Sequence, residues 1–244
     1  MDTQIIAIIY ATFFMASFIK GVTGLGFAIL TLPVVTSFIP LYEAIPLIII
    51  PSFSSNIIII VQTGRFRQSV KRFWLLYIAA FPGLYIGVHL LSAAGHHISR
   101  MALGASAIIY ASLILFRVNI SVPQSREKYY SVPIGFVNGV VNGLTGTQVM
   151  PMLPYLLSLN QDMNGLINAI NVGFTLSSIV LLIFLHTFNL FDTDIVIYSV
   201  FAVIPVASGI YLGSRMRRML SEEKFRMAVL ILLVLIGSIL IINP

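Results

Sequence analysis

One four-residue pattern, Gly-x-Thr-Gly, occurs twice in this chain, and each copy interrupts a strongly apolar stretch. The first copy is Gly21-Val22-Thr23-Gly24 and the second is Gly143-Leu144-Thr145-Gly146. The similarity continues downstream, where the residues of 83–87 reappear in closely related form at 209–213. A chain made of two similar apolar halves, each with a glycine-broken segment, is typical of membrane transporters.

Composition excludes a water-soluble domain. Hydrophobic residues make up 58% of the chain and charged residues only 9%, whereas soluble domains carry about 25% charged residues. Because so few charges cannot cover a surface that faces water, we expect an integral membrane protein in contact with the lipid bilayer. The net charge of +6 does not indicate a nucleic-acid partner, because bases of membrane proteins collect in cytoplasmic loops. The absence of cysteine excludes disulfides and thiolate metal sites.

The apolar segments predict an all-α integral membrane protein with two inverted-topology repeats. We expect a single transporter domain over 1–244, with a first repeat over about 1–118, a linker over about 119–129 and a second repeat over about 130–244. Each repeat should begin with a glycine-broken pair of short helices and continue with three longer spanning helices. The short segments fall below the roughly 20 residues of a spanning helix, so they either cross the membrane or re-enter it. The expected segments are 4–19, 25–40, 44–62, 73–92 and 99–117 in the first half, and 130–142, 147–159, 165–186, 194–213 and 225–242 in the second.

Charges between the segments predict that the halves are inverted. Four bases precede the fourth segment of the first half: Arg65, Arg67, Lys71 and Arg72. The matching stretch of the second half holds the acids Asp192 and Asp194 instead. The next loop reverses the contrast, and there the second half carries Arg215, Arg217, Arg218, Lys224 and Arg226. Because bases favour the cytoplasmic side, equivalent loops should lie on opposite sides, with the linker and its Arg117 inside and both termini outside.

The two breaks are the best candidates for a substrate site. A helix that restarts after a break directs free N–H groups and the positive end of its dipole at the turn, so two such ends would bind an anion. Hydroxyl and amide groups would add donors, and Lys20 would add a full charge. The polar faces of the third segments lie nearby in the sequence, at 52–56 and 168–178. The candidate substrate-binding residues are Lys20, Gly21, Thr23, Gly24, Gly26, Asn142, Gly143, Thr145, Gly146, Thr147, Gln148, Asn171 and Thr175.

Two alternatives remain open for these residues. The glycines could serve only to let helices pack closely, as small residues do in membranes. Lys20 could be the base of a tight cytoplasmic turn rather than a substrate contact. A Lys near the middle of the bilayer would need a partner or an anion, because its burial costs a few kcal/mol.

The remaining titratable residues do not predict an enzyme. All eight acids lie in or near the expected loops, so no intramembrane carboxylate indicates proton coupling or a cation substrate. Membrane hydrolases need clustered His, Asp or Glu, or a Ser beside a base, and the sequence shows no such cluster. We therefore expect no catalytic residues, no metal site and no cofactor.

The two breaks, each followed by a proline, resemble the signature motifs of the TauE/SafE sulfite exporter family. The matching stretches are Gly21 to Pro33 and Gly143 to Pro154, and the two-half layout agrees over nearly the whole chain. The resemblance implies a permease or exporter for a small anion, either sulfite or an organosulfur anion such as a sulfonate, in the cell (inner) membrane. We expect alternating access, with the site between the two Gly-x-Thr-Gly breaks. An anion channel with the same site, a transporter of an unrelated small solute, and a homo-oligomeric assembly stay open.

Overall fold

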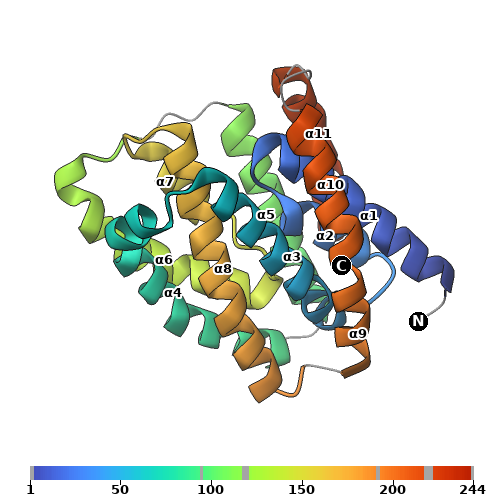
Figure 1. The fold of residues 1–244 in the computed structure, drawn as a ribbon. Coiled ribbons are helices and arrows are strands. Elements are labelled where there is room, and N and C mark those ends of the chain that lie inside the picture. The colour runs from blue at the N-terminus through green and yellow to red at the C-terminus, as the bar shows by residue number, and fades with distance from the viewer. Residues whose placement is uncertain (1–2, 94–95, 117–120, 191–192, 217–221, 243–244) are drawn as a thin grey trace.

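The regular structure of the described part of the chain is helical. The computed structural model describes residues 3–93, 96–116, 121–190, 193–216 and 222–242, and their arrangement is drawn in Figure 1. In chain order the α-helices are α1 (Thr3–Thr23), α2 (Phe27–Val35), α3 (Leu41–Thr63), α4 (Phe66–Ala93), α5 (His96–Leu115), α6 (Glu127–Thr145), α7 (Met152–Ser158), α8 (Met163–Thr187), α9 (Thr193–Phe201), α10 (Val203–Met216) and α11 (Glu222–Ile242), with a short 3-10 turn at Gln124–Arg126 before α6. The predicted all-helical class is confirmed.

Among the described residues, five helical stretches are long and apolar enough to cross a membrane. They are α1, α3, α4, α8 and the stretch Ile195–Met216 that α9 and α10 share. By contrast, α2 has nine residues and α7 has seven. At 1.5 Å per residue neither could cross a hydrocarbon core of about 30 Å. The chain is therefore a multi-pass membrane protein in which two short helices end or begin inside the fold.

The first segment of each half is longer than the sequence suggested. Helix α1 has 21 residues and runs through Lys20 to Thr23, instead of ending near residue 19. Helix α6 has 19 residues and begins at Glu127, instead of near residue 130. Both extensions pass through charged side chains that find partners inside the protein, so these charges do not end the helices. The fourth segment of the second half is also divided, into α9 and α10.

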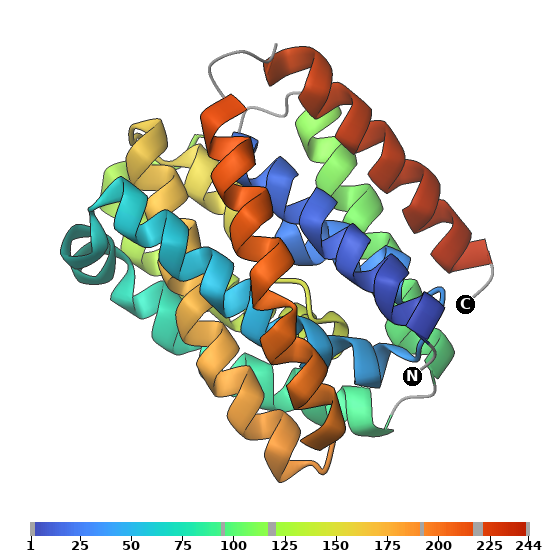
Figure 2. The ribbon, with the colours of Figure 1, turned by 45° about the vertical axis from the view of Figure 1, so that its right-hand side comes forward.

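Each half packs its first helix on a late helix of the other half. The most extensive contacts join α4 to α6, and α1 to α10. Helix α5 packs along α11, which Figure 2 shows on one side of the molecule, and α3 crosses α8 near the centre. Glycines permit the closest of these approaches, since a Cβ added at Gly139 would lie 2.0 Å from the carbonyl oxygen of Ala80. The halves are thus interleaved rather than laid side by side.

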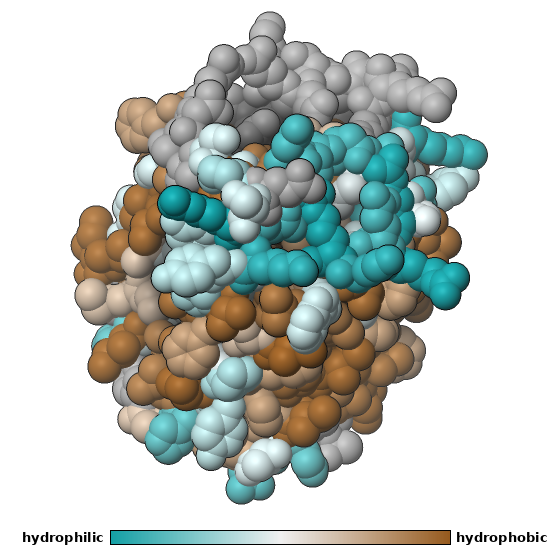
Figure 3. Space-filling model, turned by 90° about the vertical axis from the view of Figure 1, so that its left-hand side faces the viewer, coloured by the Kyte–Doolittle hydropathy of each residue, from teal (hydrophilic) through white to brown (hydrophobic). Residues whose placement is uncertain are grey.

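Basic side chains gather at one end of the molecule, which we call the basic end. Its exposed bases are Arg67, Lys71, Arg126 and Lys128. Figure 3 shows hydrophilic residues over one end of this face and a broad hydrophobic band beside them. Arg67, Lys71 and Arg72 lie in the first turns of α4 and not in a loop, because only Gly64 and Arg65 separate α3 from α4. The residues Arg117, Asp192, Arg217 and Arg218, and the side chains of Asp194, Lys224 and Arg226, lie outside the described part.

Candidate functional site

The first break is a tight turn built around Thr23. Helix α1 ends there, and the backbone then passes through Gly24 and Gly26 with φ values of +83° and +102°. Residues with a Cβ are disfavoured in this left-handed region, whereas glycine adopts it without steric cost. The Thr23 hydroxyl lies 3.0 Å from the Ile19 carbonyl oxygen and 2.9 Å from that of Leu25. The hydroxyl therefore closes the turn with the backbone of its own segment.

The second break uses the same elements in a more polar setting. Helix α6 ends at Thr145, and Gly146 has a φ of +73°. The Thr145 hydroxyl donates to the Val141 carbonyl at 2.7 Å and lies 2.8 Å from the Thr147 hydroxyl. The first N–H of α7, on Met152, donates to Asn138 Oδ1 at 3.2 Å. One of the two expected free helix ends is therefore already occupied by a side chain, and α7 itself is only seven residues long.

Lys20 is buried beside the first break. Its side chain is 2% exposed, and it sits inside α1 rather than in a turn, so the tight-turn alternative is wrong. The ammonium group donates to Ser55 Oγ at 2.9 Å and to Asn56 Oδ1. Both partners are neutral, and within the described residues Lys20 forms no ion pair with a carboxylate. The sequence indicated the polar face of α3 but gave no signal that it would receive this lysine.

Helix α8 connects the two breaks. Asn171 Nδ2 donates to the Gly24 carbonyl at 3.1 Å, which ties α8 to the first break. Gln148 Nε2 donates to Ser178 Oγ at 3.1 Å, which ties the second break to the same helix. These two anchor positions of α8 are about 10 Å apart along the helix axis, given 1.5 Å per residue. Thr175 lies between them, so the polar face of α8 spans the distance from one break to the other.

A small cavity lies where the second break meets α2, α3 and α8. Its volume is about 10 Å³, which is enough for about one water molecule. The polar groups at its wall come from Ser52, Gln148 and Ser178, while most of the remaining wall is aliphatic. A Cβ added at Gly146 would lie 2.8 Å from Ile45 Cγ1 and 3.0 Å from Leu32 Cδ1. The space at the second break is therefore too small for an oxyanion.

Several buried amide atoms near the breaks lack a hydrogen-bond partner. The unpaired atoms are Asn56 Nδ2, Asn142 Nδ2 and Oδ1, Gln148 Oε1 and Asn171 Oδ1. An unpaired buried polar atom costs about 1–3 kcal/mol, so such atoms are rare unless a water, an ion or a ligand uses them. All four side chains come from helices or turns that border the breaks. These unpaired atoms make the region a candidate site for a polar ligand.

The predicted residues fall into three groups. Gly21 and Gly143 lie at helix contacts, where an added Cβ would meet the carbonyl oxygens of Ile210 and Leu84, both at 2.6 Å. The packing alternative thus describes these two glycines. Gly24, Gly26 and Gly146 shape the turns. The polar members Lys20, Asn142, Thr145, Thr147, Gln148, Asn171 and Thr175 are all buried, and Thr23 is half-buried.

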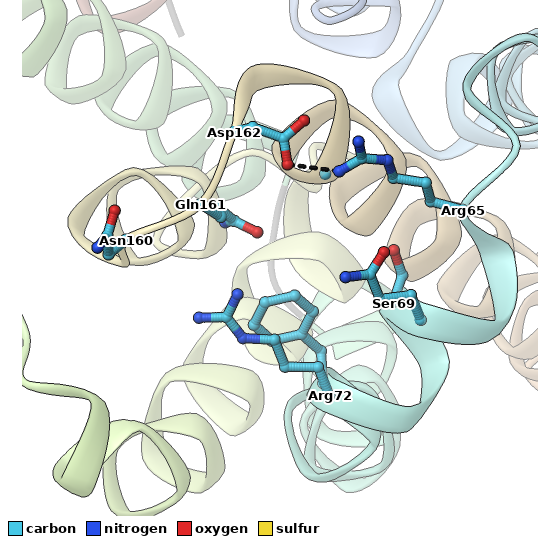
Figure 4. Close-up of a pocket in the computed structure, with 9 residues that line it drawn as sticks. Arg65, Ser69, Arg72, Asn160, Gln161 and Asp162 are labelled. Carbon is cyan, nitrogen blue, oxygen red and sulfur yellow. Dashed lines mark hydrogen bonds and ion pairs between the residues drawn. The ribbon is translucent and has the colours of Figure 1, made fainter.

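A second cavity, which the sequence did not indicate, opens at the basic end. It has a volume of about 230 Å³ and lies between the start of α4 and the turn between α7 and α8. Its wall contains Arg65 and Arg72 on one side and Asn160, Gln161 and Asp162 on the other, as Figure 4 shows. Nothing in the repeat pattern could reveal it, because its two walls are far apart in the sequence.

Comparison with known proteins identifies the family of this chain. The family description "Sulfite exporter TauE/SafE" matches residues 9–240, nearly the whole chain. No curated protein and no solved structure matches the chain. The family is one of membrane transporters of the sulfite and organosulfur type, which agrees with the apolar spans. The chain therefore belongs to the sulfite exporter TauE/SafE family.

Proposed function

We propose that the protein carries a small anion, sulfite or an organosulfur anion such as a sulfonate, across the cell membrane by alternating access. The substrate binds between the two Gly-x-Thr-Gly breaks. The observation that carries this proposal is Lys20, a buried ammonium that only neutral side chains contact. A membrane protein keeps such a charge at a cost of a few kcal/mol, and an anion that arrives from either side would compensate it.

The polar groups beside Lys20 and at the two breaks suit a small oxyanion. Hydroxyls and amide N–H groups can donate to anionic oxygens, and Asn56 Nδ2 and Asn142 Nδ2 are buried donors without a partner. Sulfite and sulfonates present several oxygen acceptors on one sulfur atom, so a few convergent donors can bind them. Thr23, Thr145 and Thr147 would join by rotating their hydroxyls away from the backbone and from one another. Gln148, Asn171 and Thr175 would hold the α8 side of the site.

Alternating access requires a site that opens and closes, and two related halves. The cavity at the second break holds only about one water, so the site would have to widen before a substrate could enter it. The contacts of α4 with α6 and of α1 with α10 are exchanged equivalents if the halves are inverted repeats. With the basic end in the cytoplasm, both chain termini lie outside. Rocking of one half against the other would then open the breaks to each side in turn.

The test replaces Lys20 with methionine, which has similar length and no charge. Purified protein in liposomes loaded with sulfite should lose most of its sulfite flux in Lys20→Met and keep part of it in Lys20→Arg. Lys71→Met is the matched control, because Lys71 is exposed at the basic end. Sulfite flux at the wild-type level in Lys20→Met would refute the proposed site. Flux that never saturates and shows no counter-transport would favour a channel, and flux of uncharged solutes alone would favour an unrelated substrate.

A further inference from the structure

The cavity at the basic end has the shape and polarity of a second binding site. Its volume of about 230 Å³ lies just below the range of pockets that hold drug-sized ligands, so it suits a small ion with some water. The wall combines Arg65, Gln68, Ser69 and Arg72 with the turn that carries Asp162. This cavity is separate from the small central cavity, and the two share no lining residue.

Each arginine of this cavity is held by one carboxylate. Arg72 donates to both oxygens of Glu127, at 2.9 Å from Nε and 3.0 Å from Nη2, and Glu127 is buried. That pair fixes Arg72 as part of the wall. Arg65 Nη1 lies 2.5 Å from Asp162 Oδ1, and these side chains are 38% and 55% exposed. The second pair is open to water and therefore easier to exchange for another anion.

Other donors around the cavity are uncommitted. The side chains of Gln68 and Asn160 are exposed and have no hydrogen bond to any described residue. Figure 4 shows the guanidinium of Arg72 directed toward the turn that carries Asn160. An anion in this space would meet two guanidinium groups and two amides. Guanidinium groups recognise oxyanions through paired N–H donors.

Charges outside the cavity favour the same occupant. Arg67 and Lys71 of α4, Arg126 of the 3-10 turn before α6, and Lys128 of α6 are exposed nearby. With Arg65 and Arg72 they outnumber Glu127 and Asp162, so the basic end is electropositive. Such a field raises the local concentration of small anions before they enter a site.

We infer that this cavity is an anion-binding vestibule in which Asp162 competes with the incoming oxyanion for Arg65. The inference rests on the proposed transport of a small anion, since the vestibule would load or release the same substrate at the basic end. When the anion binds, Arg65 leaves Asp162 and turns into the cavity, and when the anion leaves, Arg65 returns. Asp162 is thus an internal mimic of the substrate that keeps the affinity low enough for release.

The experiment exploits the opposite roles of the two partners. Sulfite is titrated by calorimetry onto detergent-solubilised wild type, Arg65→Gln, Asp162→Asn and the control Arg67→Gln, at an ionic strength of about 0.15 M to screen distant charges. Both test variants lose the same ion pair, so a purely structural role would shift sulfite affinity in the same direction or not at all. The vestibule predicts about fivefold weaker binding in Arg65→Gln and about fivefold tighter binding in Asp162→Asn, as suits a half-exposed pair. Arg67→Gln should change sulfite affinity much less than either test variant, because Arg67 lies outside the cavity and the salt screens its charge.

Two outcomes would overturn the vestibule: shifts of equal sign in the two variants, or no shift in either. A repeat of the titration in Lys20→Met separates the vestibule from the central site. Opposite shifts that persist there place anion binding at the basic end even if Lys20→Met still transports sulfite, which would refute the central site alone. Loss of the opposite shifts in Lys20→Met would mean that Arg65 acts only through the central site, and the vestibule would be wrong.

Discussion

Replacing Gly146 with alanine tests how tightly the neighbouring side chains pack against the second break. Gly64 provides the matched control, because both glycines end a helix with nearly equal left-handed φ values, +73° at Gly146 and +68° at Gly64. Alanine in this conformation costs about 1–2 kcal/mol at either position. The surroundings differ, since nothing lies within 4 Å of a Cβ added at Gly64.

At Gly146 the added methyl group meets a buried wall. It would lie 2.8 Å from Ile45 Cγ1 and 3.0 Å from Leu32 Cδ1, and both residues are at most 2% exposed. Overpacking of this kind costs a further 1–3 kcal/mol or so. We therefore expect Gly64→Ala to lower the free energy of unfolding by about 1–2 kcal/mol and Gly146→Ala by about 2–5 kcal/mol.

Reversible unfolding of the purified protein in mixed detergent micelles measures both values, and sulfite flux in liposomes gives the functional readout. Flux per folded molecule should fall only in Gly146→Ala, because its methyl group fills the space beside Gln148 into which the site must open. Equal destabilisation of the two variants would refute the argument that Ile45 and Leu32 leave no room for a methyl group at Gly146. Normal flux in Gly146→Ala would show that the break does not open during transport.

Three further predictions concern other contacts. Thr145→Val should weaken sulfite binding while the protein still inserts into the membrane. Thermal-shift titration with sulfite measures the binding, and a melting-temperature shift equal to that of the wild type would show that the hydroxyl only stabilises the fold. Glu127→Gln should destabilise the fold by about 2 kcal/mol because it leaves Arg72 without its bidentate partner, and a double-mutant cycle with Arg72→Gln should return a coupling of similar size. Gly139→Ala should reduce the yield of monodisperse protein on size-exclusion chromatography more than Thr145→Val or Glu127→Gln does. The added methyl group would meet the backbone carbonyl of Ala80, which cannot move aside as a side chain can.

The sequence was sufficient for the class of fold and for the family. High hydropathy predicted the membrane, and the motif around Thr23 and Thr145 indicated the family, because both signals are local in the chain. Helix ends were less predictable. Lys20 could have been the base of a tight turn, yet it lies within α1, because Ser55 and Asn56 of α3 receive its charge.

The candidate site was only partly accessible to sequence reasoning. The glycine breaks were visible, whereas the role of Gly21 depends on the backbone of Ile210, which no local pattern announces. The pairing of Arg65 with Asp162 was hidden for the same reason. Such contacts arise from tertiary packing of segments that the sequence separates widely.

The interleaving of the halves has a consequence for biogenesis. Helix α1 leaves the ribosome well before its most extensive partner, α10, so Gly21 can meet Ile210 only after all the residues between them have been made. Contacts between residues so distant in sequence form late and slowly. During synthesis α1 must therefore remain in the bilayer without α10, so its insertion and its final packing are separate events in time.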